Sequence, residues 1–487
     1  MMIATTVLVV GAGPAGLLTA VELVRRGVQC LLIDAHEQPM DWDRATVVHP
    51  RSIEILDALG IADTLLRLGV RQRHARIHAD GAVLGDIDLS LCGSRYPFNI
   101  GISEEVTEFI LHDYLVAHGG AVTRATTLVG LAAQPDGVTA TIDQRGARAE
   151  VHAQWVVGCD GHHSTVRTLT GIEQDGHDIH QPWAVFDAAI PAWPESFEAN
   201  YAYLDPTPVI LTALPDRRWR VYLRPRSAQS DLVADALATL QRYLPEARFD
   251  QISHPTRFDC HTKVARTFRS GRVLLAGDAA HTCSPAQGHG MNTGLQDAYN
   301  LGWKLAAVLA GAPEALLETY EAERRPVAAD VLGLSTRLLA GFKAGDNRRP
   351  REVQQLDIGY PTSPLSLPSQ ADSRLVPGHR APDAIVRGAG GSPTRLFNLF
   401  KGTHWTLLVN GRSTFAPSAG LHIHSIGPGM EIEDCLDQFA RFYGLAEGAA
   451  VLVRPDGYLA GVFAGDGAAV LRAHLRSYCK LGGNPHL

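Results

Sequence analysis

A glycine fingerprint near its start is the feature that most restricts how this 487-residue chain can fold. The apolar run Val7–Val10 leads into Gly11-x-Gly13-x-x-Gly16, and apolar residues at helical spacing follow over residues 17–24. The first glycine permits a tight turn, the second lets a ligand approach the backbone, and the third lets the helix pack closely on the strand. This strand–turn–helix pattern predicts a Rossmann-like βαβ unit that binds a dinucleotide.

An acid supports the same prediction. Asp34 closes a second apolar run, Val28–Ile33, where a carboxylate can accept hydrogen bonds from an adenosine ribose. The helix that starts at Pro14 and Ala15 offers free N–H groups and its positive dipole end to the phosphates. Because a carboxylate repels a 2′-phosphate, the pattern fits FAD or NAD.

Two further segments place an acid beside a glycine after an apolar run. Val156–Val157 leads to Asp160-Gly161, and Val273–Ala276 leads to Gly277-Asp278. A glycine-punctuated loop then enters a helix, and its backbone N–H groups can lie against a flat ligand. We expect the three apolar runs to be strands of one sheet, with a second unit inserted between them.

In this order, the three motifs resemble those of the class A flavoprotein monooxygenases, the p-hydroxybenzoate hydroxylase-like aromatic hydroxylases. The resemblance covers roughly residues 5–340. Through Pro377–Pro382 and Leu452–Tyr458, the tail is similar to the C-terminal domain of the phenol, hydroxyphenylpropionate and polyketide hydroxylase branch. The implied α/β fold has a Rossmann-like, GR2-type FAD-binding domain, an inserted antiparallel β-sheet substrate domain and a thioredoxin-like C-terminal α/β domain.

The pattern of runs and turns suggests how these domains divide the chain. The FAD-binding domain is expected to be discontinuous, over residues 1–75, 100–180 and 265–342. Residues 76–99 and 181–264 would form the substrate domain, where alternating stretches favour an antiparallel sheet. A polar segment rich in Pro, Gly and Arg, residues 343–374, is predicted to link it to the C-terminal domain at 375–487.

The resemblance implies that FAD is bound without a covalent link, by residues at matching positions. The ADP half would be bound by Gly11, Gly13, Pro14, Ala15, Gly16 and Asp34, and the ribityl chain by Gly277 and Asp278. Arg44 would lie against the flavin and phosphates, and Asp160 with Arg167 would take part in FAD and nicotinamide handling. The flavin loop, Pro285 to Asn292, which contains Gly288, Gly290 and Met291, would lie along the ring system.

The sequence departs from the family pattern at several of these positions. Glu104 stands where the family usually has a glutamine that bonds the cofactor, and a carboxylate near phosphates is unfavourable unless it meets a hydroxyl or solvent. Gln287 and His289 stand where the branch commonly has Gly and Gln. We therefore expect FAD binding, with a changed pocket shape.

The implied reaction is the hydroxylation of a phenolic or polycyclic aromatic compound, such as a polyketide or an antibiotic. NAD(P)H, bound transiently, reduces the FAD, and O2 then forms a C4a-hydroperoxyflavin that transfers one oxygen atom. Three alternatives stay open: the same flavin peroxide used for Baeyer–Villiger insertion or antibiotic inactivation, a flavin dehydrogenase or oxidase without oxygen transfer, and a flavin-binding carrier.

The substrate pocket should lie between the flavin loop and the inserted sheet. Its candidate lining is Tyr201, Tyr203, Trp219, Arg220, Tyr222 and Pro285, with residues 95–98 facing them, although aromatic residues also pack in half-buried sheets. No catalytic base can be singled out. His289 and Pro285 are the catalytic candidates, and the alternative for His289 is a hydrogen-bonded structural histidine.

Composition narrows the partners. The net charge is −7 and no block of five like charges occurs, which argues against a nucleic-acid partner, and no apolar tract is long enough for a membrane span. Seven scattered cysteines without a CxxC pattern favour reduced thiols in a cytoplasmic protein. His177-x-x-His180 lacks further metal ligands at suitable spacing, so no metal is expected. A monomer or homodimer is expected.

Overall fold

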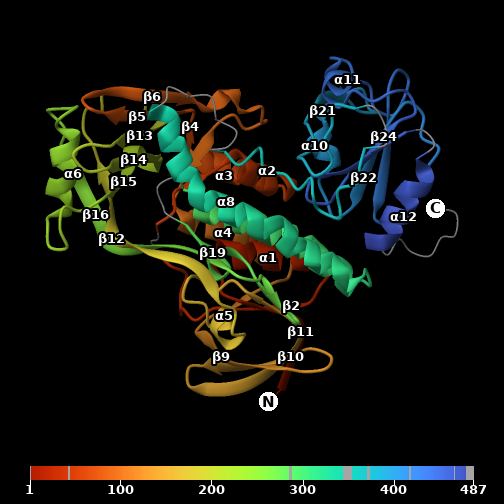
Figure 1. The fold of residues 1–487 in the computed structure, drawn as a ribbon, viewed down its shortest axis with the longest axis horizontal. Helices are drawn as coiled ribbons and strands as arrows, with labels where there is room; N and C mark the ends of the chain where they lie inside the picture. The colour runs from red at the N-terminus through yellow and green to blue at the C-terminus, as the bar shows by residue number, and fades with distance from the viewer. Residues whose placement is uncertain are drawn as a thin grey trace.

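The structure is a computed structural model that describes residues 2–41, 44–283, 288–343, 354–369, 373–415, 418–464 and 467–478. Pro285 and Gln287 lie outside the described residues, as does the side chain of His180. Three bodies are visible in Figure 1: a central α/β domain, a sheet domain beside it and a C-terminal domain. Among the described helices, none is long and apolar enough to cross a membrane.

A central sheet carries the glycine fingerprint. Its strand order is β17-β18-β11-β1-β2-β8, and β10 and β9 extend β11 as an antiparallel ribbon. The strands are β1 (Met2–Val10), β2 (Cys30–Ile33), β8 (Val122–Thr123), β9 (Thr126–Ala133), β10 (Val138–Gln144), β11 (Ala147–Gly158), β17 (Arg269–Ser270) and β18 (Val273–Leu275). Because β1, β11 and β18 pair in parallel, the three predicted runs are neighbours and their motifs follow at one edge of the sheet.

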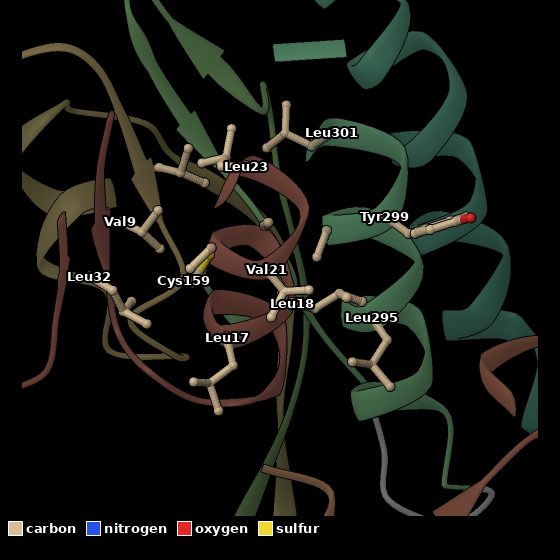
Figure 2. Packing of buried hydrophobic residues seen from close by; sticks show 14 of the residues in the cluster. Val9, Leu17, Leu18, Val21, Leu23, Leu32, Cys159, Leu295, Tyr299 and Leu301 are labelled. Atoms are coloured by element: carbon tan, nitrogen blue, oxygen red, sulfur yellow. The ribbon is translucent and has the colours of Figure 1, made fainter. Parts of the chain in front are cut away.

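Helix α1 (Pro14–Val24) lies between this sheet and α7 (His289–Leu309). In Figure 2, Val9 and Leu32 face α1 from the sheet, and Leu295 faces it from α7. These side chains are fully buried, which stabilises the layers by about 25 cal/mol per Å² of apolar surface. The other helices of this domain are α2 (Pro50–Ala58), α3 (Ala62–Leu68), α4 (Glu104–Ala117), α5 (Thr165–Leu169) and α8 (Glu318–Lys343).

The inserted domain is built on a second sheet, in the order β19-β16-β12-β15-β14-β13-β5-β6. Its strands are β5 (His74–Ala79), β6 (Ala82–Asp88), β12 (Gln174–Ala189), β13 (Ala199–Tyr203), β14 (Val209–Leu214), β15 (Arg218–Leu223), β16 (Asp250–Ala265) and β19 (His281–Thr282). Helix α6 (Leu232–Leu240) covers one face. A separate three-stranded sheet, in the order β3-β7-β4, is formed by β3 (Val47–Val48), β7 (Asn99–Gly101) and β4 (Val70–Gln72).

The C-terminal domain has a four-stranded sheet in the order β23-β22-β24-β25, in which only β22 and β23 are parallel. Its elements are β20 (Ile385–Arg387), β21 (Pro393–Arg395), α10 (Leu396–Leu399), β22 (Trp405–Asn410), β23 (Leu421–Ile426), α11 (Gln438–Tyr443), β24 (Ala450–Val453), β25 (Leu459–Phe463) and α12 (Ala468–Tyr478). Trp303 of α7 packs in one core with Trp405 and Leu407, so this domain is docked on the central one.

Part of the predicted linker, residues 343–374, is interior. In its described part, 354–369, Gln354, Gln355, Tyr360 and Leu365 are buried. The Tyr360 ring packs against the Tyr458 ring of the C-terminal domain at a tilt of 46°, and the Tyr360 hydroxyl accepts a hydrogen bond from Arg324 of α8. The polar composition of this segment therefore reflects buried hydrogen bonds between the domains as well as exposure to solvent.

Candidate cofactor and substrate site

A cavity of about 620 Å³ lies where the three motifs meet. Its walls come from segments far apart in the chain, and they include Gly13, Pro14, Ala15, Arg44, Glu104, Asp160, Gly277, Asp278, Gly288, Gly290 and Met291. The cavity continues to the inserted sheet, where Tyr222, Phe258, Cys260 and His261 line it. The structure thus brings most of the predicted cofactor positions to one space that also reaches the predicted substrate domain.

The three fingerprint glycines have different reasons to be glycine. Gly11 has φ +97°, and a Cβ there would lie 2.4 Å from the carbonyl oxygen of Cys159. A Cβ on Gly16 would lie 1.8 Å from the Gly11 carbonyl oxygen, so both residues are required by the packing of the fold. At Gly13, φ is −74°, and the nearest atom to a Cβ would be Glu108 Oε1 at 3.7 Å. Gly13 therefore leaves free space in the cavity wall.

Asp34 organises the turn. Its Oδ2 accepts a hydrogen bond of 2.7 Å from the backbone N–H of Ala12, and its Oδ1 accepts one of 2.9 Å from the N–H of His36. Arg124 lies 3.4 Å from the same Oδ1. Asp34 does not itself line the cavity, so its predicted bond to a ribose stays a prediction.

The Asp160-Gly161 segment is fastened to the Gly277-Asp278 segment by Arg167. Asp160 accepts hydrogen bonds from Ser164 Oγ and from the N–H of Val166, which orders the first turn of α5. Arg167 donates to the carbonyl oxygens of Ala279 (2.8 Å) and His162 (2.7 Å). Burial raises the pKa of the Asp160 carboxyl against the effect of these hydrogen bonds. The segment is structural in addition to lining the cavity.

A buried acid that the sequence did not reveal supports the second segment. Asp297, fully buried in α7, accepts hydrogen bonds from Gly277 N–H, His281 Nε2 and Arg324 Nε. Burial alone would raise its pKa, but His281 and Arg324 lower it below the usual range. Asp278 projects into the cavity, and there burial raises its pKa despite His281 and Arg44. A single acid within a helix of mixed composition gives no motif, so Asp297 could not be predicted.

The described part of the flavin loop is held from the side of β3. Asn292 Oδ1 accepts a hydrogen bond from His49 N–H (2.8 Å), and its Nδ2 donates to the carbonyl oxygens of Val47 and Gly288. His289 is buried against the ring of His49, with 5.0 Å between ring centroids. Neither Asn292 nor His289 lines the cavity, which favours the structural reading of His289. Pro285, the other catalytic candidate, lies outside the described residues.

Three predicted substrate residues lie on the face of the inserted sheet that packs against α6. Tyr201, Tyr203 and Trp219 pack in the core beneath α6 and do not line the cavity. Arg220 and Tyr222 point to the other face because side chains alternate along a strand. Tyr222 lines the cavity, and its hydroxyl bonds Thr46 Oγ1 and the Arg44 carbonyl oxygen. Arg220 instead forms a buried ion pair with Asp187 on β12, at 2.7 Å.

The aromatic wall of the cavity includes a residue that sequence reasoning missed. Phe258 of β16 lines it beside Tyr222, and the Arg44 guanidinium lies over the Phe258 ring, 5.2 Å from its centroid. The facing segment predicted at 95–98 lies elsewhere, since Arg95 is paired with Asp57 of α2. Phe258 could have been found only from the register of the sheet, because β16 is long and mostly polar.

Comparison with known proteins decides the family. Residues 4–335 match the family described as FAD binding domain, and residues 374–480 match the aromatic-ring hydroxylase C-terminal family. The chain belongs to the class A flavoprotein monooxygenases. The match over 4–335 spans both the central domain and the inserted sheet.

Similar proteins span this class A monooxygenase over almost its whole length. A flavin-dependent monooxygenase of Mycobacteroides abscessus is 34% identical, over 96% of this chain and 98% of its own. The 6-methylpretetramide 4-monooxygenase of Streptomyces rimosus is 32% identical, over 97% and 93%. A solved ternary complex of aklavinone-11 hydroxylase with FAD and aklavinone has a TM-score of 0.81 at 26% identity, covering 98% and 99%.

The residues of this monooxygenase fit FAD. Glu108, Asp160 and Asp278 line the cavity together with the fingerprint, and Phe258 forms an apolar wall. A side chain at Gly13 would fill the space beside the fingerprint. Gly288, at the N-cap of α7, provides no side-chain cap, and a helix start of this kind can offer backbone N–H groups to a ligand. Gly13, Ala15, Gly277, Asp278 and Gly290 are the positions we expect FAD to touch.

Two acids of α4 face this cavity of the monooxygenase. Glu104 Oε2 accepts a hydrogen bond of 3.2 Å from the N–H of Ala45, so it supports the segment that carries Arg44. Glu108 lies one helical turn further on, beside Gly13. Burial and the neighbouring Glu104 raise the pKa of the Glu108 carboxyl to about 8.

This shift predicts that FAD binding weakens as the pH rises through about 8. Glu108 is protonated below this pH, and an ionised carboxylate beside Gly13 would repel the pyrophosphate. The complex therefore holds more protons than the free protein, and affinity falls by up to about tenfold per pH unit above that point. Flavin fluorescence titrations from pH 6.5 to 9.5 measure this, with Glu108→Gln expected to flatten the profile. The same slope in both proteins would refute it.

Proposed function

We propose that the chain uses NAD(P)H and O2 to hydroxylate a phenolic or polycyclic aromatic compound of the polyketide or antibiotic type. The observation that carries this proposal is the single cavity that runs from the fingerprint to the Tyr222 and Phe258 wall. A cofactor seated on the glycine motifs would thus share one space with an aromatic substrate. Two of the similar proteins named above act on, or were solved with, compounds that suit this class: 6-methylpretetramide and aklavinone.

The residues of the chain supply binding, orientation and exclusion of water. When bound, FAD would supply the redox chemistry, taking electrons from NAD(P)H so that one oxygen atom of O2 is passed to the ring and the other leaves as water. Gly13 and the flavin-loop glycines admit the cofactor to backbone contact, and Arg44 contributes positive charge at its phosphates or ring. The Tyr222 hydroxyl is engaged by Thr46 and the Arg44 carbonyl, which fixes the Tyr222 ring as a wall for an aromatic substrate.

The inserted sheet offers a matched pair of variants. Phe258→Ala removes an aromatic face from the cavity, and we expect it to raise KM for the aromatic substrate about tenfold. Phe197 packs against the core on the α6 face, so Phe197→Ala should lower stability without changing KM. Steady-state NAD(P)H oxidation with varied substrate checks both. Equal KM values for the two variants would place the substrate away from Phe258.

A substrate screen tests the proposal itself. Purified protein loaded with FAD is offered phenols, hydroxylated aromatic acids and aromatic polyketides, with NADH or NADPH, and pyridine nucleotide oxidation and product mass are followed. We expect at least one compound to stimulate oxidation and to gain one oxygen atom. If the substrate is oxidised but the product contains no added oxygen atom, whether or not O2 is present, the protein would instead be a dehydrogenase or oxidase.

A further inference from the structure

The segment 354–360 contacts the rear of the cofactor site. It belongs to neither the central sheet domain nor the C-terminal sheet, yet Gln355 and Tyr360 are buried to within 4% exposure. We infer that Gln355 and Tyr360 are positioning residues that hold the start of α7, residues 288–293, and the Gly277 turn in the geometry that binds FAD. This inference rests on the FAD site alone and is independent of the substrate proposed above.

Gln355 reaches the flavin loop through Thr293. Its Nε2 donates a hydrogen bond of 2.9 Å to Thr293 Oγ1, and its Oε1 accepts one of 2.7 Å from Gln296 Nε2. The Thr293 hydroxyl in turn donates to the carbonyl oxygen of His289, at 2.9 Å. His289 stands between Gly288 and Gly290, which both line the cavity. A side chain from the interdomain segment is therefore two hydrogen bonds from the cavity wall.

Tyr360 reaches the Gly277 turn through Arg324. The Tyr360 hydroxyl accepts a hydrogen bond of 2.9 Å from Arg324 Nη1, and Arg324 Nε donates to Asp297 Oδ1 at 2.7 Å. Asp297 accepts the N–H of Gly277 through its other oxygen. Arg324 also donates to the Thr293 carbonyl oxygen at 3.2 Å, so the two chains of hydrogen bonds meet on α7.

The need for such support follows from the chemistry of a ligand-binding helix start. The first N–H groups of α7 must stay free if FAD is to bind there, so a side-chain cap cannot order this turn from the front. Hydrogen bonds to carbonyl oxygens and to side chains on the rear of the helix can order it without occupying the ligand's donors.

The backbone conformation of Gln355 also supports a positioning role. It has φ +56°, a left-handed conformation that costs a residue other than glycine about 1 kcal/mol or more. Such a conformation persists where surrounding contacts determine it, and in the described part of the chain those contacts include the two side-chain hydrogen bonds of Gln355 to α7. The segment is thus shaped to present this side chain to the helix.

The test compares variants that lose a hydrogen bond to the cofactor site with a variant that loses a contact between the domains. Gln355→Ala and Tyr360→Phe each remove one chain of hydrogen bonds, and the second keeps the ring that packs on Tyr458. We expect each to raise the Kd for FAD about tenfold, measured by fluorescence titration of FAD-free protein. The visible circular dichroism of the bound flavin should also change, because the loop against it is less ordered.

Lys401→Met is the matched control, since it removes an ion pair between the C-terminal domain and Asp57 of α2 and leaves the hydrogen bonds of Gln355 and Tyr360 in place. We expect this variant to bind FAD like the parent, with the parent flavin spectrum. The inference is overturned if Tyr360→Phe binds FAD with the parent Kd and spectrum, or if Lys401→Met weakens binding as much as the two test variants. Thermal unfolding of the FAD-free proteins shows whether a variant that binds FAD more weakly is also less stably folded.

Discussion

Replacing Gly13 by alanine is expected to leave the FAD-free protein folded and to weaken FAD binding by about 100-fold. The φ of −74° at Gly13 suits alanine, and the new Cβ would lie no nearer than 3.7 Å to any protein atom outside its own neighbours. At such a position, Gly→Ala stabilises a fold by about 0.4–1 kcal/mol. The same Cβ projects into the cavity where the pyrophosphate must approach the backbone.

Gly11→Ala provides the contrast. Its Cβ would collide with the Cys159 carbonyl at 2.4 Å, on a backbone with φ +97°, so this variant should lose folding and FAD binding together. Thermal unfolding of the FAD-free protein and fluorescence titration with FAD separate the two effects. If Gly13→Ala bound FAD with unchanged affinity, the cavity beside Gly13 would not be the pyrophosphate site.

Replacing Arg454 by methionine is expected to be the most destabilising change in the interface between the central and C-terminal domains. Arg454 is buried and bonds both carboxylate oxygens of Glu323, at 2.7 and 2.9 Å, and also Asp456. Burial alone would raise the Glu323 pKa, but Arg454 and Lys304 hold it well below the usual range. Removing one partner of such a buried group costs about 3–5 kcal/mol.

We expect the unfolding temperature to fall by about 3–5 °C in a thermal scan, because the unfolding entropy of a chain of this length is about 1 kcal/mol per kelvin. The control is Arg387→Met, which removes an exposed pair with Glu433 at 3.7 Å and should change stability by less than about 1 kcal/mol. A scan in which Arg454→Met unfolds like Arg387→Met would mean that solvent already reaches the buried charges and screens them.

Local patterns carried the prediction of the cofactor half of the site. The fingerprint, the acid after the second strand and the two later acid–glycine turns are each short segments whose neighbours in sequence determine their structure. Parallel strands end at one edge of a sheet, so such segments meet even when more than a hundred residues separate them. Gly13 and Asp278 could therefore be assigned to one cavity, where the structure places both.

The substrate half required information that one sequence does not contain. Alternation along β15 separates Trp219 from Tyr222, but it does not say which face meets the cavity. Burial beneath α6 selects Tyr222 and excludes Trp219, Tyr201 and Tyr203. The buried acids Asp297 and Glu323 could not be predicted either. Their partners come from distant segments, so no short sequence motif identifies them.

Oxygen isotope labelling tests the central claim most directly. The FAD-loaded protein, NAD(P)H and the aromatic compound that most stimulates NAD(P)H oxidation are incubated under isotopically labelled O2, and the product is analysed by mass spectrometry and NMR. The account predicts one labelled oxygen atom, as a hydroxyl group on a ring carbon. A product without labelled oxygen, or with the label in a new ester, would contradict the claim that the protein hydroxylates an aromatic ring.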